Sequence, residues 1–202
     1  MAWCRKEAPL SSGPVGAPYT GSLMDATRWA FQYSPGMPPF PKQIGAVWGF
    51  DFPILPASVH YLVAAINRPV TDIYGEIEIT GDGVFTARIP NQDADDGVPA
   101  VRPYFQRRGD NVSGAGEFEH YRWWSNPALV QLRPGVFTVS APLDPARWSS
   151  VYGKTGDTVP EAFAAAVANC VLTGMTFGGW FAGHGVALTS GSAAFICRDW
   201  RA

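Results

Sequence analysis

The chain has 202 residues, enough for one large hydrophobic core, and its low charge already excludes some classes of function. Charged residues make up 16% of the sequence, against roughly 25% in an average soluble protein, while aromatic residues reach 13%. The net charge of -2 provides no broad positive field for phosphates, so nucleic acid is not an expected partner.

The N-terminal stretch, residues 1–25, is rich in Pro, Gly, Ser and Ala and shows no hydrophobic period. We expect it to form an arm before a single β-sandwich domain over residues 26–202, and the arm is a candidate for contacts with another protein subunit. No signal peptide and no apolar run of membrane-spanning length, roughly 18 residues, is seen. Localisation stays open: extracellular or at the cell surface if a signal peptide was removed, otherwise the virion or the cytoplasm.

Alternating hydrophobicity predicts short β-strands through the first half of the chain. The predicted strands span residues 27–33, 46–52, 59–64, 74–80 and 101–107. In the first of them Trp29, Phe31 and Tyr33 share one face. In the third, Val59, Tyr61 and Val63 share a face.

The second half of the chain continues this pattern and adds two helical segments. Strands are predicted over 118–124, 136–141, 175–177 and 193–200, a helical turn at Asp144-Pro145, and a helix over 158–169 capped by Thr158. The segment 118–124, FEHYRWW, carries aromatic residues on both faces of an extended strand, so one face is expected to meet something other than the core.

Many short strands separated by Gly and Pro turns, with helices confined to connections, predict an all-β fold. The expected architecture is a jelly-roll-like antiparallel β-sandwich with one or two short helices in its connections. The large side chains expected in the core are Trp29, Phe31, Trp48, Phe50, Val59, Tyr61, Ile77, Ile79, Phe105, Phe137, Val139, Phe177 and Phe195.

The Gly-rich loop after residue 177 and the YRWW segment supply the components of a carbohydrate site. Such a site needs aromatic faces that stack on the C–H side of a sugar and planar polar groups that fix its hydroxyls. The candidate ligand-binding residues are Trp180, Phe181, His184, Trp124, Tyr121, Arg122 and Asp110. For each aromatic residue the alternative is a place in the core.

An acidic loop at residues 91–97, NQDADDG, begins like a calcium loop, with candidate ligands Asp93, Asp95 and Asp96. It lacks the closing Glu of an EF-hand, and a solvated acidic turn is the alternative. No other cofactor is expected, because the three histidines show no metal-binding spacing.

The three cysteines, Cys4, Cys170 and Cys197, form no C-x-x-C pair. Two buried thiols at Cys170 and Cys197 are the favoured interpretation, and a disulfide between them is the alternative. The sequence also contains no nucleophile elbow, P-loop, dinucleotide fingerprint or zinc-protease motif, so no catalytic residue is predicted.

Three segments of the C-terminal half carry a resemblance to a known type of fold. They are VFTVSAPLDPARWSSVYG (136–153), LTGMTFGGWFAGHGVAL (172–188) and SAAFICRDW (192–200). Their order resembles a galactose-binding-like jelly-roll of the carbohydrate-binding-module type, over about residues 100–202. The YRWW and FGG-x-x-x-GHGV patterns are also similar to uncharacterised bacterial proteins of secreted or lipoprotein type, a likeness that implies no function.

These observations lead to ranked hypotheses about function. The first is a non-catalytic β-sandwich module that binds carbohydrate, as the resemblance implies. The alternative is a structural or assembly protein, such as a virion decoration or tail component. The third is a glycan-active enzyme, which would need a site assembled in space from residues distant in sequence.

Overall fold

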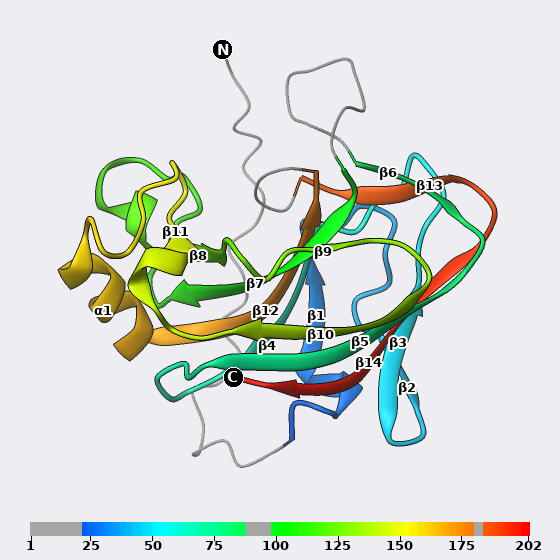
Figure 1. Ribbon diagram of the computed structural model, residues 1–202, viewed down its shortest axis with the longest axis horizontal. Helices are drawn as coiled ribbons and strands as arrows, with labels where there is room; N and C mark the ends of the chain where they lie inside the picture. The colour runs from blue at the N-terminus through cyan, green and yellow to red at the C-terminus, as the bar shows by residue number, and fades with distance from the viewer. Residues whose placement is uncertain (1–21, 88–97, 180–183) are drawn as a thin grey trace.

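Two β-sheets pack against an aromatic core in the computed structural model, which describes residues 22–87, 98–179 and 184–202. Figure 1 shows the strands crossing the molecule, with the helix α1 (Pro160–Ala168) at one end, beside β8 and β11. Neighbouring strands within both sheets run antiparallel. This arrangement confirms the all-β, antiparallel β-sandwich with short helices in its connections.

The larger sheet has seven strands among the described residues, in the spatial order β1-β4-β12-β7-β8-β11, with β9 paired to β7. The strands are β1 Trp29–Gln32, β4 Tyr61–Ala65, β7 Ala100–Arg107, β8 Arg122–Ser125, β9 Val130–Gln131, β11 Trp148–Ser149 and β12 Cys170–Gly178. We call it the large sheet.

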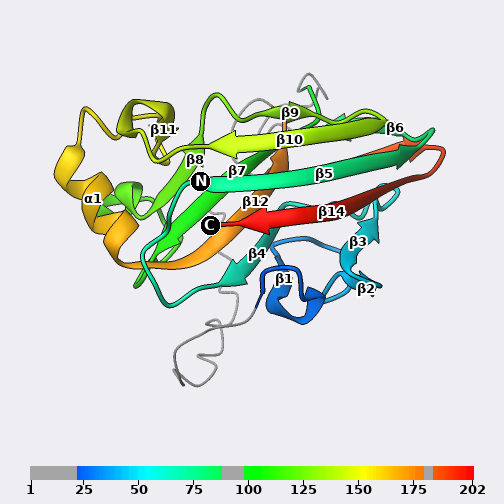
Figure 2. The same ribbon diagram turned by 60° about the horizontal axis from the view of Figure 1, so that its bottom comes forward.

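The small sheet has the order β10-β5-β14-β3-β2, and Figure 2 shows β10, β5 and β14 side by side. Its strands are β2 Lys42–Ile44, β3 Val47–Asp51, β5 Ile73–Gly81, β10 Gly135–Ala141 and β14 Ala193–Arg201. A two-stranded ladder of β6 (Val84–Ala87) and β13 (Val186–Ser190) completes the strands of the described chain.

The helical segments are short: three 3₁₀ turns, η1 Ala26–Arg28, η2 Gly116–His120 and η3 Pro145–Arg147, accompany α1. The Asp144 carboxylate accepts a hydrogen bond from the Ala146 amide, which confirms the predicted turn. The predicted cap of α1 is wrong, because the Thr158 hydroxyl donates to the Thr155 carbonyl instead. Within the described residues, none of the helices has the length and apolar character that a membrane crossing needs.

The core between the sheets is built from aromatic rings. Trp29 of β1 and Trp48 of β3 lie with ring centroids 4.5 Å apart, and both indole N–H groups donate to the Leu23 carbonyl. Phe50 stacks on Phe195 across the β3–β14 ladder at 5.1 Å. Because the indole N–H groups of Trp29 and Trp48 both have this partner, these two rings are buried at no cost in lost hydrogen bonds.

Most of the predicted core residues are buried, but three are only partly so. Phe31 and Phe137 pack at the margin of the core. Tyr61 is wrongly placed in the prediction, because Leu62 and Ala64 form the inner face of β4 while Tyr61 and Val63 face outward. Both faces of this strand are apolar, so alternation alone does not identify the inner one.

Three further predictions are corrected. Tyr33 lies beyond the end of β1, with a positive φ of 51°, so it leaves the face of Trp29. Residues 118–124 are not one strand: 118–120 belong to η2, and only Arg122–Ser125 is extended. Residues 186–190, assigned to the Gly-rich loop, form β13 instead, because β6 supplies a partner strand.

Candidate functional site

The outer face of the large sheet carries three residues of the predicted site, Arg122, Asp110 and Trp124. Arg122 and Asp110 form an ion pair there, with the Arg122 Nε 2.9 Å from the Asp110 Oδ2. Their side chains are 9% and 0% exposed. The second Asp110 oxygen accepts from the Val112 amide, and Arg122 also donates to the Val112 carbonyl. The loop after β7 is thereby held against β8.

Two further polar side chains extend this pair along β7. The Gln106 Nε2 donates to the Asp110 Oδ2 at 2.9 Å, and the Tyr104 hydroxyl donates to the Gln106 Oε1 at 2.8 Å. Tyr104 and Gln106 lie on one face of the strand, two residues apart, which is why they can meet. The result is a continuous chain of contacts from Tyr104 through Gln106 and Asp110 to Arg122.

Four aromatic rings lie in a row over this network. The centroid distances are 5.8 Å from Tyr33 to Tyr61, 5.3 Å from Tyr61 to Tyr104, and 5.3 Å from Tyr104 to Trp124. Exposure falls along the row, from 43% at Tyr33 to 1% at Tyr104 and Trp124. The Tyr33 end of the row is therefore open to solvent, while Trp124 offers no open ring face.

Burial dominates the electrostatics of this region. It raises the pKa of Tyr61 to about 12 and holds the pKa of Tyr104 well above its ordinary value. Burial also raises the pKa of Asp110, an effect that the Arg122 charge opposes. The two phenols are therefore neutral at physiological pH, and they act as hydrogen-bonding groups without charge.

Tyr121 lies apart from this row, on the other side of the loop. Its ring is 8% exposed, packs against Phe118 at 5.0 Å, and lies under the Arg107 guanidinium at 4.4 Å. Its hydroxyl donates to Glu117. The structure thus brings together Trp124, Arg122 and Asp110 of the predicted set, but Tyr121 has separate partners.

His184 follows the Gly-rich loop and is partly buried, which lowers its pKa. The other residues predicted in this loop, Trp180 and Phe181, lie outside the described residues, as do the predicted calcium ligands Asp93, Asp95 and Asp96. Those assignments stay predictions. Among the described residues, no group of three or more His, Cys, Asp or Glu side chains is arranged to hold a metal ion.

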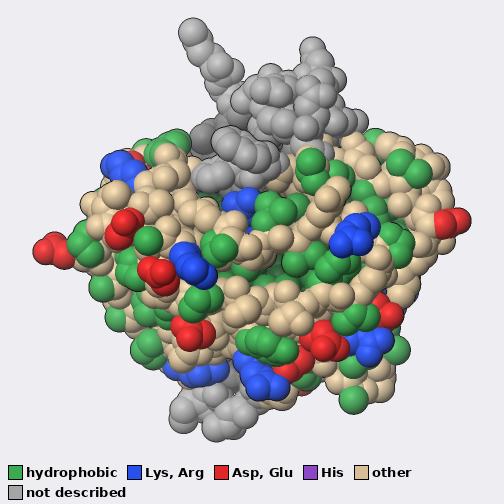
Figure 3. Space-filling view, in the orientation of Figure 1, with side chains coloured by type: hydrophobic (Ala, Val, Ile, Leu, Met, Phe, Trp, Pro, Cys, Tyr) green, Lys and Arg blue, Asp and Glu red, His purple; other side chains and the backbone are tan. Residues whose placement is uncertain are grey.

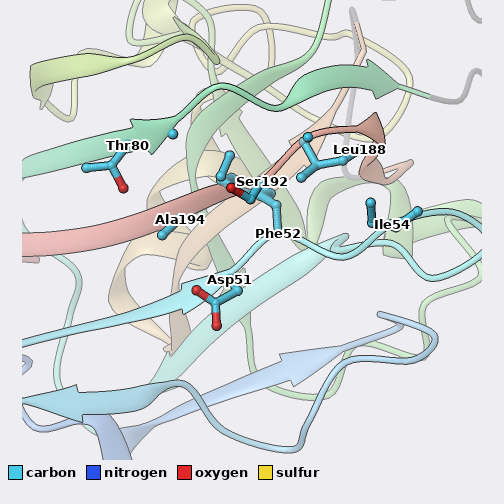
Figure 4. A pocket seen from close by; sticks show the side chains of 10 residues that line it. Asp51, Phe52, Ile54, Thr80, Leu188, Ser192 and Ala194 are labelled. Carbon is cyan, nitrogen blue, oxygen red and sulfur yellow. The ribbon is translucent and has the colours of Figure 1, made fainter.

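A second feature, not predicted from the sequence, is a shallow pocket of about 290 Å³ at one end of the small sheet. Figure 4 shows its lining, which comes from the ends of β3 and β5, from β13 and from the start of β14. We call it the Asp51 pocket. The residues that line it are Asp51, Phe52, Ile54, Thr80, Gly81, Leu188, Gly191, Ser192, Ala193 and Ala194.

Strand register explains why a pocket forms here. Ala194 of β14 lies opposite Asp51 on one side and Thr80 on the other. Neighbouring strands lie about 4.8 Å apart, so Asp51 and Thr80, which lie on either side of β14, are about 10 Å apart. The Ala194 methyl group between them forms the floor. Ile54, half exposed at 51%, adds an apolar wall. A small residue between two longer ones produces the depression.

The polar groups of the Asp51 pocket keep free hydrogen-bonding capacity. Asp51 Oδ2 lies 3.1 Å from the Lys42 Nζ, and both side chains are at least 70% exposed. Within the described chain, the Thr80 and Ser192 hydroxyls have no hydrogen-bond partner. The Ser192 backbone, by contrast, is fixed, because its carbonyl accepts from the Asp82 and Gly83 amides. The hydroxyl is therefore presented from a rigid turn.

Comparison with known proteins adds no family to this description. No protein-family model, no curated protein and no solved structure matches the chain. The chemistry of the described residues therefore supplies the basis for a functional proposal.

Proposed function

We propose that the protein is a non-catalytic carbohydrate-binding module and that the Asp51 pocket receives a single sugar unit. The observation that carries the proposal is the set of polar groups around Ala194: one carboxylate and two hydroxyls with unused hydrogen-bonding capacity, beside an apolar wall. Small-ligand sites combine an apolar surface with a few placed polar groups in this way. The galactose-binding-like resemblance of the C-terminal half agrees with the proposal.

Asp51, which lines the pocket, and its ion-pair partner Lys42 suit a pair of neighbouring hydroxyls. A sugar hydroxyl can donate to the free Asp51 Oδ1, while the next accepts from Lys42 Nζ, which has three donors and uses one for Asp51. Thr80 and Ser192 can bond a third position, because a hydroxyl both donates and accepts. Ile54 and the Ala194 methyl group cover the C–H side of the ring.

The network of Arg122 and Asp110 has a different role in this proposal. Its groups already bond one another and their exposure is low, so a ligand would gain little from them. We assign it to the support of the loop after β7. The exposed Tyr33 ring remains a surface on which a longer glycan could stack.

The test is an NMR titration of the ¹⁵N-labelled protein with galactose, glucose, mannose and their oligosaccharides. We expect saturable shifts of the amides of residues 51, 52, 54, 80, 81 and 191–194 with at least one sugar. Asp51→Asn keeps the shape of the side chain and removes its charge, so affinity should fall roughly tenfold, the loss of one charge-assisted hydrogen bond. Thr80→Val should act in the same direction.

Asp157→Asn provides the matched control, because Asp157 is exposed and lies outside the lining of the pocket. Its affinity should equal that of the wild type. The proposal is wrong if no sugar shifts these amides at millimolar concentration, or if Asp51→Asn and Asp157→Asn bind equally well.

A further inference from the structure

The chain passes from one sheet to the other between β9 and β10, and a groove opens at this crossing. β9 pairs with β7 in the large sheet, whereas β10 pairs with β5 in the small sheet. Only residues 132–134 connect them, so the two strands diverge into different layers. The space between them, about 380 Å³, is lined by Leu129 and Val130, by Val136, Phe137 and Thr138, and by Arg133 at the turn.

β10 is also the last strand of the small sheet. Within the described residues it pairs with β5 on one side only, over all seven positions from Gly135 to Ala141. Exposed edges of this length are usually protected by charged residues or by Pro, because they otherwise invite another strand. The sequence of β10, GVFTVSA, contains neither. Among the described residues, this edge of β10 thus has neither a partner strand nor a protecting side chain of these kinds within the strand.

Exposed apolar side chains line the groove beside this strand edge. Val136 is 54% exposed and Leu129 is 37% exposed, one from each side of the groove. Figure 3 shows hydrophobic side chains gathered over the middle of this face, with basic side chains among them. Peptide recognition at a sheet edge uses both components, main-chain hydrogen bonds for affinity and side-chain pockets for specificity.

The charge of the groove identifies the chemistry of its occupant. Arg133 is the one charged residue in the lining, and its guanidinium lies 5.3 Å from the Phe137 ring centroid, which holds it over the groove. A carboxylate on the bound segment would complement it. A second copy of this chain paired through β10 would supply no such group, because Gly135–Ala141 contains no acidic residue.

We propose that the β9–β10 groove binds an extended peptide segment of a protein partner, which adds a strand to β10, inserts an apolar side chain, and places a carboxylate on Arg133. This site lies on different strands from the Asp51 pocket, except that β5 borders both, and it does not rest on the carbohydrate proposal. It would give the module a protein attachment point beside its sugar site.

The probe is a capped synthetic heptapeptide in which Thr and Val alternate around one central Glu. Two matched peptides accompany it, one with Gln in place of Glu and one with alternate backbone amides methylated to block strand pairing. In NMR titrations of the ¹⁵N-labelled protein we expect the Glu peptide to shift the amides of residues 129–133 and 135–141. The Gln peptide should bind several-fold more weakly, and the methylated peptide should not bind.

Two substitutions locate the contact. Val136→Lys adds a charge to the exposed edge and should abolish binding, whereas Val84→Lys makes the same change at an equally exposed strand position elsewhere, 56% exposed, and should not. Arg133→Gln should reduce the affinity for the Glu peptide to that for the Gln peptide. Thermal unfolding of each variant checks that the fold is retained.

Three results would overturn the proposal. The first is the absence of shifts in residues 129–141 at millimolar peptide. The second is equal binding of the methylated peptide, which would exclude strand addition. The third is a concentration-dependent dimer of the wild type that Val136→Lys, but not Val84→Lys, dissociates, which would show that the occupant is a second copy.

Discussion

The Arg122 Nε lies 2.9 Å from the Asp110 Oδ2, and both side chains are almost completely removed from solvent. Asp110 also accepts hydrogen bonds from Gln106 and from the Val112 amide. Desolvation of two charges is costly, and such a pair is tolerated only when every polar group has a partner. The loop after β7 thus depends on the pair remaining complete.

Loss of one partner of this ion pair should therefore lower the free energy of unfolding strongly. Asp110→Ala leaves the Arg122 charge buried without a carboxylate, and we expect the free energy of unfolding to fall by about 3–5 kcal/mol. Urea denaturation measures it. The control is Asp51→Ala, which breaks an exposed pair with Lys42 and should cost about 0–1 kcal/mol. Equal effects of the two substitutions would show that the buried pair contributes no more than a surface pair.

The pH dependence of stability has a definite sign at Asp110. Burial raises the pKa of this carboxyl in the folded state above its ordinary value, so the folded state binds more protons than the unfolded chain between the two pKa values. Its contribution to the free energy of unfolding should fall as pH rises through that interval and stay constant above it. The measurement compares wild type with Asp110→Asn, which does not titrate, in urea denaturation across mildly acidic pH. A wild-type advantage that grows with rising pH would contradict the raised pKa.

The strands β3, β5, β10 and β14 of the small sheet could be predicted from the sequence, and β5 shows why, because its two faces differ in polarity. The short strand β2 of the same sheet could not, because its residues Lys42–Ile44 are all exposed and show no alternation. Ile77 and Ile79 are buried in β5, and Glu76 and Glu78 point outward, as alternation requires. β4 could not be oriented in this way, since its two faces both carry hydrophobic side chains that are largely buried, Leu62 and Ala64 on one and Tyr61 and Val63 on the other. Its inner face is decided by packing between elements that lie far apart in the chain.

The Asp51 pocket could not be predicted from the sequence for a related reason. Asp51, Thr80 and Ala194 come together only through the register of three strands separated by long stretches of sequence. No local spacing marks them, and each is an ordinary residue for its strand. By contrast, Arg122 and Trp124 were found from a local excess of aromatic and charged residues, a signal that identified the buried network rather than an open site.

The two described thiols should be inert in the folded protein. Cys170 and Cys197 are free and buried in different sheets, which agrees with the favoured interpretation of the sequence. Burial raises the pKa of Cys170 to about 12 and that of Cys197 further, so neither forms a thiolate at neutral pH. In a Cys4→Ser variant, a chromogenic disulfide reagent should react with no thiol in buffer and with both in guanidinium. Rapid labelling in buffer would show that one of them is accessible.

Gly81 connects the stability of the fold to the shape of the Asp51 pocket. It lies at the end of β5 with φ +99°, and a Cβ at this position would collide with the Ser192 carbonyl, which accepts hydrogen bonds from the Asp82 and Gly83 amides. Gly81→Ala should therefore lower the free energy of unfolding by about 1–3 kcal/mol, the usual cost of a side chain in such a conformation.

The same substitution should displace the turn that carries Ser192, so a sugar bound in the pocket should lose affinity beyond the loss caused by Ser192→Ala alone. The control is Gly45→Ala, at a positive φ of 62° where an added Cβ meets no atom within 4 Å. It shares the backbone strain and lacks the collision, so it should destabilise less and leave sugar binding unchanged. If Gly81→Ala and Gly45→Ala affected stability and binding alike, the collision with Ser192 would not govern the pocket.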